Sequence, residues 1–237
     1  MKKMLVLNHK MFLTKEEINK YIIEIKDRIP QDINVVVCPS NIYLPYFDGR
    51  YDFKLGVQNL FYKDMGAVTG EVCAKQLKSL GVSYAIIGHS ERKELFNETT
   101  SDINLKIKSA LNFGINPIVC VGETKEERLL RKTDIVLLKQ IKECFKEVVI
   151  DSAITIAYEP IWAIGKNAAS VKEIAETIDT IKEIVLKLYN VNIKVLYGGS
   201  VNETNIEQIF NLQCVDGVLV GSASTDYKKV QQIFKVI

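Results

Sequence analysis

The sequence is poor in the residues that mark several classes of protein. Its 237 residues include five cysteines, two histidines and one tryptophan, and 31 basic and 29 acidic side chains leave a net charge of +2. This balance argues against a nucleic-acid partner, which would need a concentrated basic patch. The cysteines are odd in number and no two form a CxxC pair, so no disulfide framework is expected. They are Cys38, Cys73, Cys120, Cys144 and Cys214.

Long apolar runs are also missing. No run approaches the roughly 20 residues that a membrane-spanning helix needs. The apolar run that opens the chain ends after Leu7, which is too short for the core of a signal peptide. Unpaired thiols are typical of a reducing compartment. The sequence therefore predicts a soluble, cytoplasmic protein with no membrane partner.

What the chain does have is apolar residues, which make up 47% of it and are enough for one large core. Eight short runs rich in valine and isoleucine recur along the chain. Most are continuous rather than alternating, which is typical of strands buried on both faces of a parallel sheet. The predicted strands are residues 4–8, 33–38, 53–58, 82–87, 115–121, 153–158, 192–197 and 215–220.

Helical patterns lie between these runs. Thr14 and Glu17 form a capping-box pattern at the start of the first helix. Four apolar residues then share one helical face: Ile18, Tyr21, Ile22 and Ile25. Ser170 is a second predicted N-cap, and Gly114 is a predicted helix end.

Eight strand–helix alternations without a linker predict one α/β domain over residues 1–237, a (β/α)8 TIM barrel. An open, doubly wound sheet is the alternative. Such a sheet usually has fewer strands and a glycine-rich turn after the first one, whereas here that turn reads NHKMF.

In a barrel of this kind the chemistry lies on the loops after the carboxyl ends of the strands. Lys10 follows the first predicted strand, His89 the fourth and Glu159 the sixth. Each has an ordinary reading by itself: a solvated lysine, a hydrogen-bonded loop histidine and a loop carboxylate paired with a lysine. The chain's other histidine, His9, also falls on one of these loops. Near Trp162 and Ile164, Glu159 should be partly desolvated, which suits a general base.

Glycine turns end the seventh and eighth predicted strands, as YGGS (197–200) and VGSAS (220–224). Backbone N–H groups in such turns bind phosphate, and barrels often place a phosphate site in this pair of loops. No metal-ligand cluster and no nucleotide-binding fingerprint accompanies them. A lysine, a histidine, a glutamate and a phosphate site suit proton abstraction beside the carbonyl of a small sugar phosphate.

These segments, in this order, resemble the triosephosphate isomerase family over nearly the whole chain. The matching segments are Asn8-x-Lys10, GVQN (56–59), GAVTGE (66–71), IIGHSER (86–92), CVGET (120–124), AYEPIWAIG (157–165), YGGSV (197–201) and DGVLVG (216–221). The resemblance implies an aldose–ketose isomerase that interconverts dihydroxyacetone phosphate and glyceraldehyde 3-phosphate through an enediolate, without a cofactor or a metal.

The resemblance also implies a role for each site residue. Glu159 moves a proton between adjacent carbons, and neutral His89 polarises the carbonyl and moves a proton between the oxygens. Lys10 supplies positive charge, Asn8 helps to position the substrate and Glu91 orients Lys10. The phosphate is held by the backbone N–H groups of Gly165, Ser200, Gly221 and Ser222.

Two longer segments have implied roles as well. Residues 160–169 resemble the family's lid, which closes over the phosphate and excludes water. Residues 59–71 resemble its dimer arm, in which Thr69 reaches the active site of the neighbouring subunit. We therefore expect a homodimer.

Four departures from the family pattern stand out. The lid reads Lys166-Asn167-Ala168 where the family has Thr-Gly-Lys, and it is one residue shorter. Ser222 replaces a glycine and His9 replaces a tryptophan. Lys194 replaces an arginine, so we expect its partner Asp216 to be held more loosely.

The altered lid leaves a second substrate open, a longer ketose phosphate such as a tetrulose phosphate. A non-catalytic phosphate-binding barrel is the minor alternative. That reading is disfavoured because Lys10, His89 and Glu159 are all present.

Overall fold

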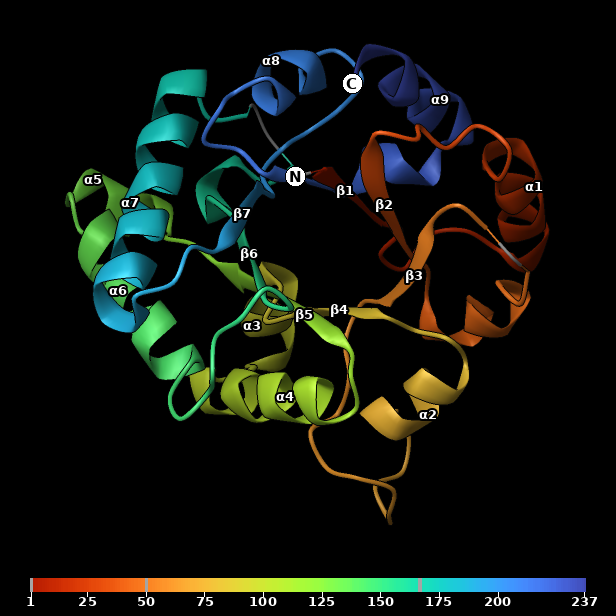
Figure 1. Cartoon of the computed structure of the whole chain (residues 1–237), viewed down its shortest axis with the longest axis horizontal. Helices are drawn as coiled ribbons and strands as arrows, with labels where there is room; N and C mark the ends of the chain where they lie inside the picture. The colour runs from red at the N-terminus through yellow and green to blue at the C-terminus, as the bar shows by residue number, and fades with distance from the viewer. Residues whose placement is uncertain (1, 50, 166–167) are drawn as a thin grey trace.

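Eight parallel strands close into a barrel in chain order (Figure 1). The computed structural model describes residues 2–49, 51–165 and 168–237. The barrel closes where β1 pairs with β8, with Met4 opposite Gly217. The strands are β1 (Lys3–Asn8), β2 (Ile33–Cys38), β3 (Lys54–Val57), β4 (Tyr84–Ile87), β5 (Asn116–Val121), β6 (Thr155–Tyr158), β7 (Lys194–Tyr197) and β8 (Gly217–Val220).

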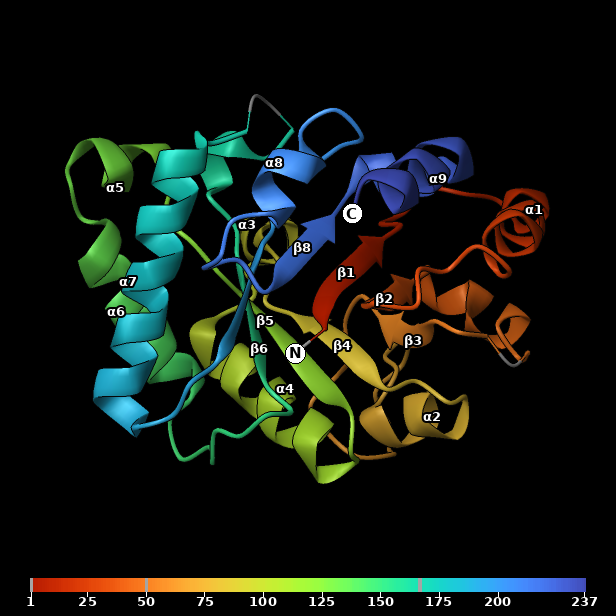
Figure 2. The ribbon, with the colours of Figure 1, turned by 45° about the horizontal axis from the view of Figure 1, so that its top comes forward.

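The eight predicted strands are confirmed, and their ends differ from the prediction by at most two residues. Because all strands are parallel, their carboxyl ends meet on one side of the barrel. Figure 2 shows the arrowheads of β1 and β8 directed to the side on which the loop after β6 lies. The predicted site loops therefore share one face.

An outer ring of helices surrounds the barrel (Figure 1). The α-helices are α1 (Lys15–Ile25), α2 (Ala74–Ser79), α3 (Ser90–Phe96), α4 (Thr100–Asn112), α5 (Lys125–Leu129), α6 (Thr133–Cys144), α7 (Val171–Tyr189), α8 (Ile206–Phe210) and α9 (Tyr227–Val236). Short 3-10 segments are η1 (Asn41–Tyr46), η2 (Ile161–Ala163) and η3 (Ser222–Thr225).

The predicted helix ends are confirmed. Thr14 and Glu17 form both hydrogen bonds of a capping box at the start of α1, and Ser170 caps α7 in the same way. Gly114 follows α4 in the left-handed region, with φ 64°, where a side chain would be strained. The four apolar residues predicted to share one face of α1 are all buried.

One predicted alternation is wrong. No α-helix follows β2, where the described chain forms the 3-10 segment η1 instead. Pro45 lies inside this segment. Proline has no N–H to donate and clashes with the preceding turn, so an α-helix cannot continue through it.

The core has two layers. The inner one fills the barrel with side chains from alternate strand positions: Met4, Val6, Val36, Cys38, Ile86, Ile118, Cys120, Ala157, Leu196 and Leu219. The outer one is larger and lies between the strands and the helices. Side chains fill the barrel, so it is a rigid platform for its loops rather than a pore.

The structure gives Asp216 a lysine partner other than Lys194. Its carboxylate accepts a hydrogen bond from the Val195 N–H at 2.9 Å and lies 2.7 Å from the ammonium of Lys182. Lys182 comes from α7, so the lysine beside Asp216 belongs to a helix and is not the one at position 194. Both contacts are made by the same carboxylate oxygen, Oδ2.

The five cysteines are all free thiols, and four of them are buried. None of the helices that the structure describes is both long and apolar enough to cross a membrane.

Candidate active site

The turn after β1 places Asn8 and Lys10 at the mouth of the barrel. The Asn8 side-chain oxygen accepts the Lys10 N–H at 3.0 Å, and Lys10 has φ 50°, a conformation that non-glycine residues rarely adopt. Ser40 and Gln58 donate to the Lys10 carbonyl oxygen at 2.9 and 2.8 Å. These contacts hold the strained turn in place, as is typical of functional sites.

The ammonium of Lys10 lies 2.5 Å from Oε1 of Glu91, which belongs to the first turn of α3. The pairing expected from the resemblance is therefore present. A lysine side chain has four rotatable bonds, and this contact restricts the position of its charge.

His89 occupies the N-cap of α3, directly after β4. Its Nδ1 accepts the N–H of Glu91 at 3.2 Å. A nitrogen that accepts a hydrogen bond carries no proton, so the ring is neutral and its proton is on Nε2. Nε2 lies 3.2 Å from Oε1 of Glu159. A neutral ring with a donor in this position can polarise a carbonyl group.

Glu159 follows β6 and is only 2% exposed. Its Oε2 accepts the N–H of Ser90 at 2.9 Å. Its Oε1 has no hydrogen bond from any described residue, because the contact with His89 lies outside hydrogen-bond geometry. The carboxylate is therefore half satisfied and lies next to the histidine.

Two glycines make room for Glu159. A Cβ at Gly122 would come within 1.8 Å of the Glu159 carbonyl oxygen, and one at Gly198 within 3.1 Å of its Cγ. The thiol of Cys120 lies close enough to Glu159 to interact with its charge. Burial, and then the charge of Glu159, raise the pKa of the Cys120 thiol well above its ordinary value, so the thiol stays neutral.

Glu123 anchors the start of the predicted lid. This fully buried carboxylate accepts hydrogen bonds from the hydroxyl of Tyr158 at 3.1 Å and from the indole N–H of Trp162 at 3.0 Å. Arg128 lies 3.4 Å from the same oxygen and over the indole ring. Burial and the Glu123 charge raise the pKa of Tyr158, so its hydroxyl remains a donor. The single tryptophan of the chain thus fixes the start of the predicted lid to the loop after β5.

The far side of the predicted lid contacts the loop after β7. Ser200 donates through its hydroxyl to the carbonyl of Ala163 at 2.7 Å, and the N–H of Ala169 donates to the hydroxyl of Tyr197 at 3.1 Å. Burial raises the pKa of Tyr197 to about 12, so this hydroxyl is protonated near neutral pH. The expected shortening falls at Lys166 and Asn167, which lie outside the described residues.

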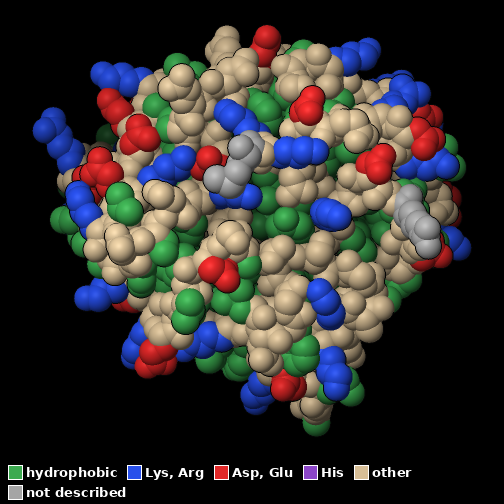
Figure 3. All heavy atoms as spheres, viewed as in Figure 1, with side chains coloured by type: hydrophobic (Ala, Val, Ile, Leu, Met, Phe, Trp, Pro, Cys, Tyr) green, Lys and Arg blue, Asp and Glu red, His purple; other side chains and the backbone are tan. Residues whose placement is uncertain are grey.

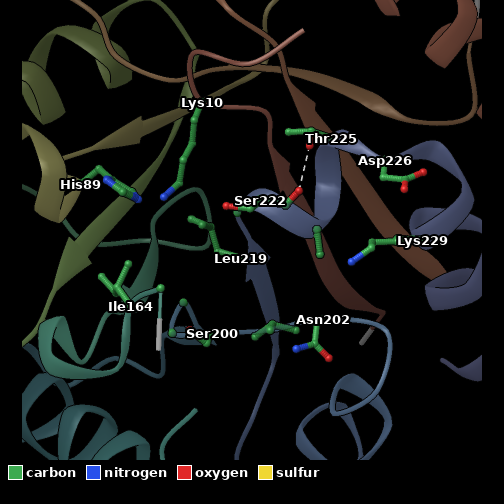
Figure 4. Close-up of a pocket in the computed structure, with 16 residues that line it drawn as sticks. Lys10, His89, Ile164, Ser200, Asn202, Leu219, Ser222, Thr225, Asp226 and Lys229 are labelled. Carbon is green, nitrogen blue, oxygen red and sulfur yellow. Dashed lines mark hydrogen bonds between the residues drawn. The ribbon is translucent and has the colours of Figure 1, made fainter. Parts of the chain in front are cut away.

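A cavity of about 470 Å³ joins these loops (Figure 4). Its lining includes Lys10 and His89 at one side and Ile164 of the predicted lid. All four predicted phosphate ligands line it as well: Gly165, Ser200, Gly221 and Ser222. Ser222 begins η3, and the leading N–H groups of a helical segment have no acceptor within it. In the space-filling view, Lys and Arg side chains gather near the middle of this face (Figure 3).

The structure brings together most of the predicted site. Lys10, His89 and the phosphate loops share one cavity, Glu159 contacts His89, and Asn8 and Glu91 contact Lys10. Among the residues described, no cluster of three or more histidine, cysteine, aspartate or glutamate side chains is placed to hold a metal ion.

Sequence reasoning missed four participants: Gln58, Ser90, Glu123 and Lys229. Gln58 follows β3, so the strand-end signal that selected Lys10 could have found it. Ser90 and Glu123 lie inside matched motifs, but their contacts come from other loops. Lys229 lies on α9, away from any strand end, and nothing in the sequence marks it.

The fold and the acid–base side chains at its carboxyl-end face define a (β/α)8-barrel enzyme. The sequence model of the family "Triosephosphate isomerase" matches residues 3–237. The chain therefore belongs to the triosephosphate isomerase family, and it is an isomerase.

Relatives of this name match nearly the full chain. The triosephosphate isomerase of Dictyoglomus thermophilum is 38% identical over 247 residues, covering 99% of each chain. That of Alkaliphilus metalliredigens is 42% identical over 228 residues and 92% of each chain. That of Mesomycoplasma hyorhinis is 41% identical over 220 residues, covering 92% of this chain and 88% of the relative.

Proposed function

We propose that the protein interconverts dihydroxyacetone phosphate and glyceraldehyde 3-phosphate through an enediolate. The observation that carries the proposal is the grouping of three side chains: a lysine and a neutral imidazole line one cavity beside glycine-rich loops, and a buried carboxylate lies against the imidazole. A carboxylate can take a proton from the carbon next to the carbonyl and return it to the neighbouring carbon. Nothing in this step changes the oxidation state of the molecule as a whole, so no redox partner is needed.

Glu159 is the base. Its carboxylate now accepts the Ser90 N–H, so it must leave this donor to reach a substrate carbon. The lost hydrogen bond makes the carboxylate less stabilised, and therefore a better proton acceptor, once it has turned toward the substrate. The N–H of Ser90 serves as a resting position for the base while the cavity is open.

His89 and Lys10 stabilise the negative charge that forms on the two substrate oxygens. The Nε2 proton of His89 is fixed by the hydrogen bond that its other nitrogen accepts. Lys10 is held by Glu91, and Asn8 holds the Lys10 backbone. Donors fixed before the reaction stabilise developing charge without reorganising, which is the largest contribution in many enzymes.

The phosphate group lies against the backbone N–H groups of Gly165, Ser200, Gly221 and Ser222. The lid, residues 160–169, closes over it and excludes water, which strengthens the electrostatic interactions and protects the enediolate. Ile164 and Leu219 both line the cavity and supply an apolar surround for this closed state.

The test measures turnover of glyceraldehyde 3-phosphate and of tetrulose phosphates by the purified protein, with no added metal or cofactor. The Glu159→Gln variant is assayed under the same conditions. We expect efficient triose turnover and a loss of at least about 10³-fold in kcat in the variant. Strong turnover of tetrulose phosphates alone would transfer the assignment to a longer substrate. If neither substrate is turned over, the protein is better described as a non-catalytic phosphate-binding barrel.

We propose that the protein is a homodimer through the arm at residues 59–71. The arm projects from the barrel between β3 and α2 (Figure 1), and its Met65 is 64% exposed. Other large apolar side chains are exposed on the segments that follow β1, β2 and β4, including η1 and α3: Met11, Phe12, Ile42, Leu95 and Phe96. Exposed large apolar side chains on these segments and on the arm favour a protein interface.

In this dimer Thr69 lies near the active site of the partner. Sedimentation or light scattering of the purified protein should give twice the chain mass of 26.8 kDa. Met65→Asp should shift it to a monomer with lower activity. A wild-type monomer of full activity would refute the interface.

The five free thiols fit a reducing compartment, and so a glycolytic enzyme of the cytoplasm.

A further inference from the structure

The active-site cavity has a second lysine at its outer end. Lys10 enters from the loop after β1, beside His89, and Lys229 enters from α9 on the other side (Figure 4). Figure 4 places Ser222 between them, with both ammonium groups directed into the cavity. The roles proposed above use Lys10 and leave Lys229 without one.

Each of these lysines is held by a glutamate. Lys10 lies 2.5 Å from Glu91, and Lys229 lies 3.2 Å from Oε1 of Glu203. Glu203 Oε2 is buried and has no hydrogen-bond partner in the described part of the chain. A buried carboxylate is costly unless it is paired. Glu203 is therefore well placed to keep the Lys229 ammonium at the rim of the cavity.

The ammonium of Lys229 remains accessible to a ligand. Its side chain is 45% exposed, against 20% for Glu203. The cavity lining includes one acidic residue of the described chain, Asp226, which caps α9 by accepting the N–H of Lys228. The uncharged polar lining at this end is Asn202, Ser222 and Thr225.

We propose that Lys229 is a substrate-recruiting residue that attracts the phosphate dianion of the substrate from the outer end of the cavity. The proposal rests on the function proposed above. The loops proposed to hold the phosphate lie between two positive charges, one on the reacting side and one on the solvent side. Lys229 is separated from His89 by these loops, so its charge acts on capture of the phosphate and not on the transfer of protons. Its effect should weaken as salt screens it.

The test compares Lys229→Gln, Lys229→Arg and Lys228→Gln. Lys228 is the matched control, because it is the adjacent lysine of the same helix, is exposed and does not line the cavity. The measurements are kcat and KM for glyceraldehyde 3-phosphate, turnover of unphosphorylated glyceraldehyde, and calorimetric binding of inorganic phosphate, at low and high salt.

We expect Lys229→Gln to raise KM and the Kd of inorganic phosphate about three- to tenfold at low salt. We expect kcat to stay within about twofold, because the charge acts on binding. Turnover of glyceraldehyde should not change, Lys229→Arg should restore both constants, and Lys228→Gln should match wild type. High salt should reduce the difference.

Three results would overturn the role of Lys229: unchanged KM and phosphate affinity in Lys229→Gln, an equal effect in Lys228→Gln, or a parallel loss of turnover with glyceraldehyde. The last would show a structural defect. If wild type fails to turn over trioses while Lys229→Gln still weakens phosphate binding, the proposed reaction is wrong and the phosphate-recruiting lysine stands.

Discussion

His9 should make the protein progressively less stable as pH falls below neutrality. The ring is completely buried, and neither of its nitrogens has a hydrogen-bond partner within the described residues. It lies edge-on to Tyr21, with ring centroids 4.5 Å apart, and the Tyr21 hydroxyl also lacks a partner there. Nothing in these surroundings stabilises a charged imidazole. Burial lowers the pKa of His9 from 6.5 to about 3.

The direction of the effect follows from this difference. In the unfolded chain His9 takes up a proton near pH 6.5, whereas in the folded chain it stays neutral until about pH 3. Between these values the unfolded state binds more protons, so the free energy of unfolding decreases as pH falls. At about 1.4 kcal/mol for each pH unit, the loss is about 2 kcal/mol at pH 5 and approaches about 5 kcal/mol near pH 3.

The perturbation is His9→Phe, which preserves an edge-on ring against Tyr21 and removes the titration. Urea unfolding followed by circular dichroism should be measured for both proteins from pH 7 to pH 5, at one protein concentration, since a dimer's stability depends on it. Carboxylates with lowered pKa values also lose stability as pH falls, but they are common to both proteins and cancel. They include Glu17, Asp102, Glu147 and Glu173.

We expect the variant to gain about 2 kcal/mol relative to wild type between pH 7 and pH 5. It should be at least as stable at pH 7, because two unpaired buried nitrogens are gone. If the two proteins lose stability in parallel over this range, His9 does not carry the effect and its burial has been misjudged. The other histidine gives a further check, since His89→Gln should not remove the difference.

Three further predictions follow from single contacts. Gly122→Ala should lower the free energy of unfolding in urea by about 1–3 kcal/mol or more, and should lower kcat, since its Cβ would collide with the Glu159 carbonyl oxygen. Unchanged stability and kcat would contradict this. Glu123→Gln should lower the free energy of unfolding by about 1–3 kcal/mol, because it alters a buried acceptor of several hydrogen bonds. It should also change the fluorescence of Trp162, the one tryptophan. An unchanged emission spectrum would argue against the contact between Glu123 and Trp162. Lys182→Met should lower the free energy of unfolding by up to about 1 kcal/mol, since Lys182 pairs with Asp216 at a partly exposed site. Lys194→Met should lower it by less. The reverse order would refute that pairing.

The sequence was sufficient to predict the strands and the face of the site. Continuous apolar runs mark strands buried on both sides, and a parallel closed sheet brings every strand's carboxyl end to the same face. Lys10, His89 and Glu159 could therefore be grouped although about 150 residues separate the first from the last. This grouping depends on topology and not on the conformation of any side chain.

Contacts that depend on the reach of side chains could not be predicted in this way. The lysine at position 194 led us to expect that Asp216 would be held loosely. In the structure, Lys182 on α7 reaches Asp216 across the helix–strand layer. Lys229 reaches the cavity from a helix, where a lysine would ordinarily be read as a solvated surface residue. Polar side chains with long stems are placed by their neighbours in space, which a single sequence does not reveal.

The proposed base and the start of the proposed lid are bonded to the end of β5 and to the loop that follows it. The N–H of Glu159 donates to the carbonyl of Val121 at 2.8 Å, and the N–H of Ile161 donates to the carbonyl of Glu123 at 3.1 Å. Because these bonds go to Val121, the last residue of β5, and to Glu123 just beyond it, closure of the proposed lid cannot move the Glu159 backbone without breaking them. The approach of the base to the substrate must therefore come from rotation of its side chain, away from the Ser90 N–H. The moving part of the proposed lid then begins beyond Trp162, whose indole donates to Glu123, and lid closure and release of the carboxylate are separate motions that the bound substrate must couple.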